Sequence, residues 1–469
     1  MSYMNKMISG LLGLLVFVSC QPDDPGNRPP TGTKQTNEWI ENTLREHYLW
    51  NTDIPLPAKL NYNLAPEQFF ESLLSLQDGK PRGIGNPHYY YSTIEKKKVE
   101  TKAIGEEDNT YGFDFEAYTV VGNENDAKGY MYGRVLFVLP NSPASQAGLK
   151  RNDWIMKING QNITTSISLL QGNAVTLTLG EYTEKGITPL RTIQLPASRK
   201  VEHNPLHFNK VYTKGNKRIG YLVYTHFAAG PDNNKDNSYD ETMKQIFADF
   251  KAKQVNEFVL DLRYNPGGLV SCAQLLTSML APASSLKDKF CILKDNNNKE
   301  SYYSMDTKGG VNLDLKRIYI LVTHHTASAS EAVINGLIPY MGRDNIVLIG
   351  TQTEGKNVGS VTYGDREGYE WLLHPITFYI FNKNGQADYS DGFTPDILFN
   401  ELDGMDNYVD LQEFGDENDP SLGIALQKIT GTKISQSYSV IKNNSVQLIP
   451  VFSSLEHRGK GGLFISESE

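Results

Sequence analysis

Buried strands and amphipathic helices alternate along residues 198–400, and no other feature of the sequence constrains the fold as strongly. The strand-like runs include NEFVLDL, RIYILVT and DNIVLIG, and helical patterns such as NSYDETMKQIFADFKAKQV and SEAVINGLIPYMG follow them. A helix between two buried strands is typical of a crossover connection, which makes neighbouring strands parallel. The sequence therefore predicts a mostly parallel α/β domain over 198–400.

Residues 101–197 have a different pattern, in which short strand-like runs such as GRVLFVL, AVTLTLG and RTIQLPA alternate with turn signals. Asn159-Gly160 is a hairpin signal. In NSPASQAGL, Ser142 is placed to cap a short helix and Pro143 to begin it. We expect a small β domain here.

Residues 38–100 have helical signals. Apolar residues of NEWIENTLREHYLW recur at helical spacing after Asn37, a candidate cap, and APEQFFESLLSLQDG predicts a second helix from Pro66 to just before Gly79. We expect a small helical unit that packs as a lid on the next domain. Residues 401–469 form a C-terminal extension with a helix at SLGIALQKITG, and we expect its last thirty or so residues to be loosely ordered.

The N-terminus has an apolar run from Met7 to Val18, which is short for a membrane span and suits a signal peptide. The run ends at Ser19-Cys20, which resembles the lipobox of bacterial lipoproteins. That resemblance implies a signal peptide over 1–19 and a lipid on Cys20, and a plain secretory signal is the alternative. Residues 20–37 are rich in Pro, Gly and polar residues, and we expect them to form a flexible tether.

Composition limits the partners. The net charge is −9 and no Lys/Arg-rich run is present, which argues against a nucleic-acid partner. No CxxC or HExxH motif occurs, so no metal or other cofactor is expected. In an oxidising compartment Cys272 and Cys291 could pair, or they could remain free and buried.

The first junction that could support chemistry is LDLRYNPGGLV, where a buried strand ends and Gly267-Gly268 precede a helix. Paired glycines allow close approach to a ligand, and backbone N–H groups at a helix N-terminus suit an oxyanion. An ordinary tight turn is the alternative.

The second junction is THHTASASEAVINGL, in which Thr326, Ser328 and Ser330 precede a helix. Ser328 and Glu331 match a capping box, so Ser328 could simply be a helix cap. It could also be a nucleophile at a helix N-terminus, with the N–H of Ala329 available to a developing oxyanion.

A nucleophilic serine needs a base. His324 and His325 are neighbours that would point to opposite faces of a strand, and both are very close to Ser328 in sequence. Lys356 lies in a glycine-bracketed loop after the next strand, which can return beside the first. A lysine acts as a base only when neutral, and desolvation favours that form. A solvated loop lysine is the alternative.

Together these motifs resemble the S41 serine peptidases, the C-terminal processing or tail-specific proteases. The resemblance rests on an ordered set over about 100–400: SPASQAGLKRNDWIMKING, LDLRYNPGG, TASASE, a Gly350-to-Lys356 loop and DGFTPDI. It implies a ClpP/crotonase-like core with Ser328 as nucleophile and Lys356 as general base. Ala329 and Gly267 or Gly268 would supply the oxyanion hole.

The third catalytic position departs from the family pattern. Many members have Gln four residues after the lysine, whereas this chain has Ser360 there. Ser360 or Glu354 could instead hold the side chain of the lysine base in position. This departure also supports the alternative of a catalytically inactive, peptidase-like binding protein.

The β domain resembles a PDZ domain, which binds a peptide C-terminus through a loop and an added strand. The resemblance implies that the corresponding loop of this chain is YGFD, which consists of Tyr111, Gly112, Phe113 and Asp114. Between Ile163 and Val175 only a short helix fits, so the groove wall is reduced.

The sequence thus predicts a multidomain α/β and α+β protein with a helical unit, a PDZ-like domain and a peptidase core. The resemblance implies a serine endopeptidase that cleaves polypeptides by a Ser/Lys dyad, with the PDZ-like domain presenting or gating substrate C-termini. YLWN near the N-terminus further resembles Bacteroidetes-type lipoprotein members, and implies attachment to the bacterial cell envelope through Cys20.

Overall fold

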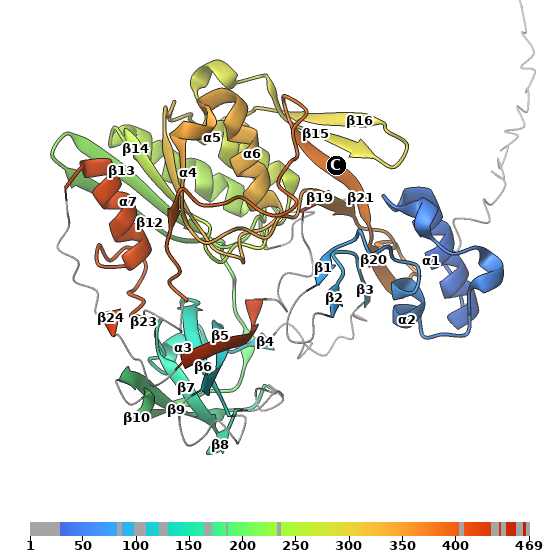
Figure 1. Ribbon diagram of the computed structural model, residues 1–469, viewed down its shortest axis with the longest axis horizontal. Coiled ribbons are helices and arrows are strands. Elements are labelled where there is room, and N and C mark those ends of the chain that lie inside the picture. Colours follow the sequence, from blue (N-terminus) through green and yellow to red (C-terminus); the bar gives the residue numbers. More distant parts are fainter. Residues whose placement is uncertain are drawn as a thin grey trace, which may run out of the picture.

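The computed structural model describes residues 29–81, 87–97, 109–121, 130–163, 170, 172–183, 186–231, 236–402, 408–432, 440–441, 447–455 and 463–465. Figure 1 shows a larger α/β core at the top, a β domain below it and a helical unit to its right. Cys20, the signal region and the first half of the tether lie outside the described residues. So does most of the predicted short helix between Ile163 and Val175.

The N-terminal unit begins earlier than the sequence indicates, because helix α1 spans Thr33–His47. Asn37 is therefore inside the helix, and the prediction that it caps the helix was wrong. Its side-chain amide instead donates to the carbonyls of Tyr62 and Leu64, at 3.0 and 2.9 Å. The other elements of the unit are the 3-10 turns Asn51–Asp53 and Pro57–Lys59, helix α2 (Pro66–Glu71) and strands β1 (Lys80–Pro81), β2 (His88–Tyr89) and β3 (Thr93–Lys96).

Helix α2 starts at Pro66 as predicted but ends at Glu71, well before Gly79. The unit does not cover the β domain, as we expected, but packs on the core. Strand β3 pairs antiparallel with β20 (Trp371–His374), and the helices share an apolar cluster with core residues such as Val358 and Ile376. The helical unit thus lies directly beside the strand that follows Lys356.

The β domain is one sheet in the order β10-β9-β7-β6-β5-β25, with β8 paired to β7. Ser142 caps α3 by accepting from the N–H of Ser145, and Asn159-Gly160 forms the turn between β7 and β8, as predicted. The elements are β4 (Asn109–Thr110), β5 (Phe113–Val121), β6 (Met131–Val138), α3 (Pro143–Gln146), β7 (Trp154–Ile158), β8 (Gln161–Asn162), β9 (Val175–Thr183), β10 (Gly186–Leu195) and β11 (Arg199–Lys200).

The core contains a six-stranded sheet in the order β12-β13-β14-β17-β18-β22, parallel except for β12. Alternating side chains face opposite sides. Leu222, Leu260 and Ile320 face the cluster under α4, α5 and α6, whereas Val259 and Leu321 face α7. The elements are β12 (Leu206–Lys214), β13 (Lys217–Tyr224), α4 (Ser238–Ala252), β14 (Glu257–Asp261), α5 (Val270–Leu280), β17 (Ile318–Val322), α6 (Ala329–Met341), β18 (Ile346–Gly350) and β22 (Ile397–Leu398), with 3-10 turns Ala283–Ser285 and Arg343–Asn345.

A second sheet, in the order β16-β15-β21-β19-β26, connects the core to the helical unit. Its strand β19 begins two residues after Lys356. Figure 1 shows β15, β16 and β21 between the core helices and α1. The strands are β15 (Lys289–Asp295), β16 (Glu300–Ser304), β19 (Val358–Val361), β21 (Ile376–Asn382) and β26 (Leu463–Ile465).

The C-terminal extension is built into all parts of the molecule. Helix α7 (Pro420–Thr430) covers the core sheet, β23 (Tyr408–Val409) pairs with β24 (Val440–Ile441), and β25 (Gln447–Ser453) joins the β domain. Because β25 and β26 are paired strands, our expectation of a loosely ordered tail was wrong for these residues. The pattern of such edge strands is short and ambiguous, which is why the sequence did not predict them.

A buried ion cluster joins the β domain to the core and to the extension. Arg263 pairs with Asp261 at 2.6 Å and Asp419 at 3.1 Å, and also with Glu401. Arg151 of the β domain lies 3.5 Å from Glu401 and 3.6 Å from Asp419. Burial opposes ionisation of Glu401, yet Arg263 and Arg151 hold its pKa at about 2. Complementary charges thus tie the β domain to the core.

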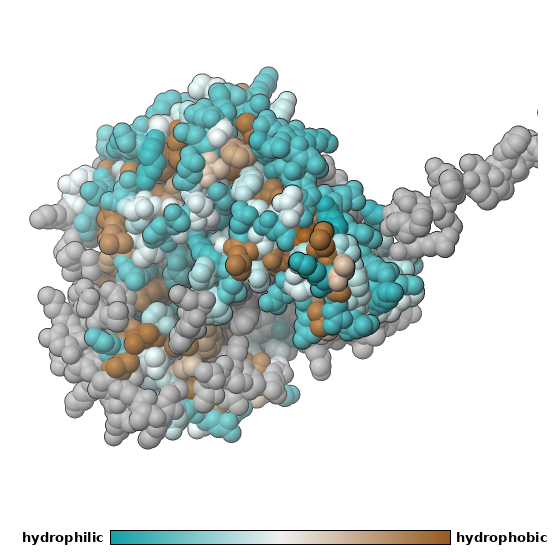
Figure 2. All heavy atoms as spheres, turned by 45° about the vertical axis from the view of Figure 1, so that its right-hand side comes forward, coloured by the Kyte–Doolittle hydropathy of each residue, from teal (hydrophilic) through white to brown (hydrophobic). Residues whose placement is uncertain are grey.

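Within the described residues, no helix combines the length and apolarity needed to cross a bilayer. On the face drawn in Figure 2, hydrophilic residues predominate and hydrophobic ones form small separate groups. Cys272 and Cys291 are both buried and are not joined by a disulfide, so the predicted possibility that they pair is not realised.

Candidate active site

The two junctions singled out in the sequence meet at the carboxyl ends of the adjacent strands β14 and β17. Asn265, in the turn after β14, connects them. Its carbonyl accepts hydrogen bonds from the N–H of Ala327 (3.1 Å) and from Ser330 Oγ (3.0 Å), on either side of Ser328. The serine loop is therefore fixed to the paired-glycine turn.

Ser328 is the N-cap of α6 and has a φ of 61°. Such a left-handed conformation is uncommon for a residue with a side chain and marks local strain, which occurs often at functional sites. Its side chain is completely buried. The capping-box interpretation is correct, since the N–H of Ser328 donates to Glu331 Oε2 at 2.9 Å. Capping and a catalytic position are therefore compatible.

Glu331 joins the serine to the lysine loop. The same oxygen, Oε2, also accepts from the N–H of Lys356 at 2.8 Å. The other oxygen, Oε1, accepts from Thr353 Oγ1 at 2.6 Å and from the N–H of Gly355 at 2.7 Å. Burial raises the pKa of Glu331 to about 7, while these hydrogen bonds act in the opposite direction. One carboxylate oxygen thus holds the backbones of Ser328 and Lys356 together.

Lys356 is 5% exposed, so the sequence alternative of a solvated loop lysine is wrong. Its Nζ lies 4.8 Å from the ring centroid of Tyr91, a cation–π distance. The hydroxyl of Tyr91 donates to Glu354 Oε1 at 3.1 Å, and Lys80 lies 3.5 Å from the same oxygen. Tyr91 and Lys80 come from the N-terminal unit, which therefore forms one wall of the site.

Gly267 lies directly against the nucleophile loop. A Cβ added at this glycine would be 2.8 Å from Ser328 Cβ and 3.0 Å from Ala329 N, and its φ is +111°. The N–H of Gly267 already donates to Asn265 Oδ1 at 2.9 Å. No described residue accepts a hydrogen bond from the N–H of Gly268. The structure therefore favours Gly268 over Gly267 as a second oxyanion donor beside Ala329.

Ser360 and Glu354, the two candidates for a third catalytic residue, have different surroundings. Ser360 is buried on β19, four residues after Lys356. Glu354 is engaged by Tyr91 and Lys80. The role of Ser360 stays a prediction.

The candidate peptide-binding loop of the β domain leads into β5. Phe113 and Asp114 are the first residues of that strand, and Tyr111 and Gly112 precede it. The N–H of Gly112 donates to Thr110 Oγ1 at 2.9 Å, and its carbonyl accepts from the N–H of Leu139 at 2.7 Å. The loop is thus fixed in place before any ligand binds.

His324 and His325 were expected to point to opposite faces of a strand, and this was wrong. Strand β17 ends at Val322, and the two rings lie 3.9 Å apart in the following turn. Among the residues that the structure describes, these two histidines and Glu116 of β5 bring three possible metal ligands within 4.8 Å of one another. His325 Nε2 and Glu116 Oε2 are 3.2 Å apart, so two of the three donors already form an interdomain pair.

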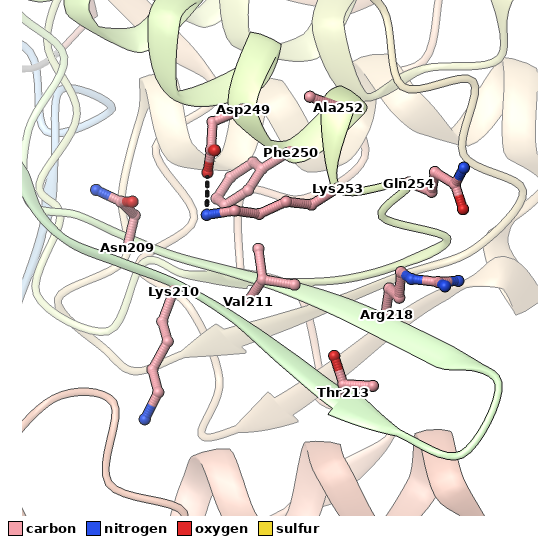
Figure 3. Close-up of a pocket in the computed structure, with 10 residues that line it drawn as sticks. All are labelled: Asn209, Lys210, Val211, Thr213, Arg218, Asp249, Phe250, Ala252, Lys253 and Gln254. Carbon is pink, nitrogen blue, oxygen red and sulfur yellow. Dashed lines mark hydrogen bonds and ion pairs between the residues drawn. The ribbon is translucent and has the colours of Figure 1, made fainter.

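A hollow of about 720 Å³ lies away from this site, between the β12–β13 hairpin and the end of α4 (Figure 3). Lys210, Arg218 and Lys253 line it, and Lys253 is paired with Asp249 at 2.7 Å. It contains no nucleophile or base of the kind described above. The candidate site therefore remains at the Ser328 junction.

Sequence reasoning missed two residues of this site. Glu331 was interpreted only as a capping partner, although a buried acid three residues after a candidate nucleophile was a usable signal. Tyr91 comes from the run YYYS in the N-terminal unit, which gave no signal because its contact with Lys356 depends on how that unit docks.

Comparison with known proteins gives matches to three family models. They are Peptidase family S41 at residues 218–399, Peptidase S41 N-terminal domain at 35–93 and PDZ domain at 134–174. The carboxy-terminal-processing protease of Bartonella bacilliformis is 27% identical over 274 residues, covering 56% of this chain and 58% of the relative. The carboxyl-terminal-processing protease of Picosynechococcus is 29% identical over 233 residues, covering 48% and 50%.

This chain spans between half and three-fifths of the length of these curated relatives. A solved structure, named "Putative S41 protease from Bacteroides fragilis NCTC 9343", matches much more completely. It is 33% identical, the match covers 84% of this chain and 97% of that one, and the TM-score is 0.70. With this match and the three family models, the chain belongs to peptidase family S41.

Proposed function

We propose that this protein is a serine endopeptidase that uses Ser328 as nucleophile and Lys356 as general base. The observation that carries the proposal is the shared carboxylate oxygen of Glu331, which accepts from the backbone N–H groups of both residues at 2.9 and 2.8 Å. A helix cap alone needs no connection to a buried lysine. Membership of family S41 supports the same assignment.

In the first half of the reaction, neutral Lys356 accepts the hydroxyl proton of Ser328 as Oγ attacks the peptide carbonyl. The negative charge that develops on the carbonyl oxygen is stabilised by the N–H groups of Ala329 and Gly268. The protonated lysine then gives its proton to the leaving amine, which leaves an ester between Ser328 and the substrate.

In the second half, a water molecule loses a proton to Lys356 and attacks the ester. The carboxylic acid product departs and Ser328 regains its proton. Tyr91 lies against Lys356 and helps to keep bulk water from the lysine, which is 5% exposed. Desolvation of this kind is what a lysine base requires. This arrangement requires no metal or organic cofactor.

We further propose that the substrates are polypeptides of the bacterial cell envelope, presented or gated by the PDZ domain through their C-termini. The proposal of a lipid anchor at Cys20 rests on the sequence pattern alone, because that residue is outside the described part. The names of two relatives, carboxy-terminal-processing and carboxyl-terminal-processing protease, support the proposal that C-termini are recognised.

The decisive experiment compares Ser328→Ala and Lys356→Ala with wild type on a denatured casein. Each substitution removes one reacting group, so we expect cleavage to fall to the background of an enzyme-free sample, with an unchanged circular dichroism spectrum. Matched controls are Ser301→Ala and Lys299→Ala, which change exposed residues of the same types. Full cleavage by either dyad variant would refute the assignment.

A further inference from the structure

The C-terminal extension occupies the edge of the β domain at which a PDZ domain takes up a peptide. Strand β5 follows the loop Tyr111–Asp114 and pairs with β6 on one side and β25 on the other. PDZ domains bind an extended peptide as an additional strand on such an edge. Here that strand is provided by the chain itself.

The direction of β25 is that of a bound C-terminal peptide. It runs antiparallel to β5, with Gln447 opposite Val121 and Ser453 opposite Glu116. Its C-terminal end therefore lies at the start of β5, next to the loop. A true C-terminus would place its carboxylate there, whereas this chain continues to residue 469.

Specific contacts hold the end of this segment. The N–H of Ser454 donates to the carbonyl of Phe115 at 3.0 Å, and Ser454 Oγ accepts from the N–H of Phe115 at 2.9 Å. The same hydroxyl donates to Asp114 Oδ1 at 2.9 Å. Phe452 packs edge-on against Phe115, with centroids 5.9 Å apart. Asp114 and Phe115 thus bind a serine near the end of the strand, as they would bind a substrate residue.

The segment also has features of a strand that can dissociate from the sheet. Pro450 interrupts it at a register shift, and proline within sheets is found on edges and at bulges because it cannot donate to a neighbour. Ile449 is a large apolar residue that is 38% exposed. Leu448, its neighbour in the same strand, is 1% exposed, so only one face of the segment is packed.

The same extension reaches the candidate active site. Strand β26 pairs in parallel with β19, placing Leu463 opposite Gly359 and Phe464 opposite Ser360. It also contacts α5, the helix that follows the Gly267-Gly268 turn. Without β26, β19 would be the open edge of its sheet.

We propose that residues 447–455 are a built-in ligand of the peptide-binding edge of the PDZ domain, which a polypeptide must displace before it can bind there. The segment competes with substrate C-termini because both need the same backbone donors and acceptors of β5. The catalytic consequence rests on the proposed peptidase function, whereas the binding competition does not.

The test uses the full chain and a fluorescein-labelled peptide QLIPVFSSL, which copies residues 447–455 and ends in a free carboxylate. In wild type the resident segment blocks the edge, so we expect weak binding by fluorescence anisotropy. The variant Phe452→Ala/Ser454→Pro removes the aromatic contact and the N–H donor from the tail and leaves β5 unchanged. We expect it to bind the peptide about tenfold or more tightly, because the apparent Kd falls as the competent fraction rises.

Ile449→Ala is the matched control, since it changes the same strand at a partly exposed side chain, and we expect its affinity to equal that of wild type. Equal affinity of wild type and the double variant, with both folded by circular dichroism, would overturn the proposal. So would cooperative unfolding of the β domain in the double variant, which would show that β25 is a permanent strand.

The activity assay separates the two proposals. With a denatured casein, we expect the double variant to have a higher kcat/KM than wild type. If the peptide binds as expected but no variant cleaves any polypeptide, the built-in ligand stands and the proposed peptidase function fails. If the double variant cleaves faster without binding the peptide at all, the peptidase function stands and the competition at β5 is refuted.

Discussion

At the scale of single residues, the candidate site depends on a carboxylate that takes no part in the bond changes. Glu331 is completely buried and accepts four hydrogen bonds. Two come from the N–H groups of Ser328 and Lys356, and two come from Thr353 and Gly355 in the loop before Lys356. Since it acts through the backbone of Ser328 and Lys356, Glu331 is a positioning residue. Its replacement should change rate more than substrate affinity.

We predict that Glu331→Gln lowers kcat by on the order of 100-fold, because small displacements of reacting groups cost about that much. A glutamine has one acceptor oxygen and directs an NH₂ group at N–H donors. KM should stay within about threefold of wild type, since substrate contacts are unchanged. Steady-state kinetics on a peptide substrate would measure both constants.

The control for this variant is Glu241→Gln, which changes a half-exposed carboxylate on α4. Glu331→Gln is assayed at a temperature at which its circular dichroism spectrum matches that of wild type. A lower kcat then cannot result from partial unfolding of the variant. An unchanged kcat, or a rise in KM with kcat constant, would contradict the positioning role.

At the scale of elements, two strand-to-helix junctions form one site because β14 and β17 are neighbours in a parallel sheet. Parallel strands bring their carboxyl ends to the same edge, where loops of α/β proteins carry function. Asn265 then fixes the turn after β14 to the loop after β17. The separation between these junctions is set by backbone packing, with no room for a side chain at Gly267.

We predict that Gly267→Ala abolishes cleavage, because its Cβ would lie 2.8 Å from Ser328 Cβ and displace the nucleophile. Gly309→Ala is a matched control. It also has a positive φ, +85°, but no atom lies within 4 Å of the added Cβ. Both variants carry backbone strain of roughly 1–3 kcal/mol, measurable as a loss in the free energy of unfolding by urea titration. Loss of activity in both, or in neither, would contradict this account.

At the scale of the whole molecule, the PDZ domain touches the loop that carries Ser328 directly. Glu116 of β5 lies 3.2 Å from His325, three residues before Ser328, and β5 also carries β25. The charged and titratable groups around Glu116 are His324, His325 and Tyr118. Occupation of the β5 edge and the position of the nucleophile loop are therefore physically connected.

We predict a pH-dependent stability from Glu116. Burial raises its pKa from 4.5 to about 7, and His324 and Ser453 offset this in part. The folded protein therefore holds the proton more tightly than the unfolded chain, and the resulting stabilisation is present below pH 4.5 and lost as the pH rises through about 7. A shift of this size corresponds to about 3 kcal/mol in the free energy of unfolding.

Urea titrations of wild type and Glu116→Gln at several pH values between 4.5 and 8 would check this prediction. The glutamine cannot titrate, so the stability of wild type relative to the variant should decrease across this interval. Parallel stability curves for the two proteins would show that Glu116 does not titrate in this range.

The sequence by itself determined the local features of this protein. Strand–helix alternation predicted the parallel core, and turn residues predicted the Ser142 cap and the Asn159-Gly160 hairpin. These predictions succeeded because periodicity, capping and turn chemistry act over a few residues. Motif order also pointed to Ser328 and Lys356, whose catalytic roles stay predictions. The errors at Asn37 and at the end of α2 arose where tertiary contacts outweighed local preference.

Only the tertiary structure decided which distant residues share the site. Tyr91 reaches Lys356 because the helical unit docks on the second sheet, and Glu331 joins two loops because β17 and β18 are adjacent. The pairing of β25 with β5 joins residues more than 300 positions apart, and no local pattern encodes such a partner. Long-range pairing depends on the energy of the whole packed chain. The pairing of β25 with β5 and of β26 with β19 was therefore visible in the fold and not in the sequence.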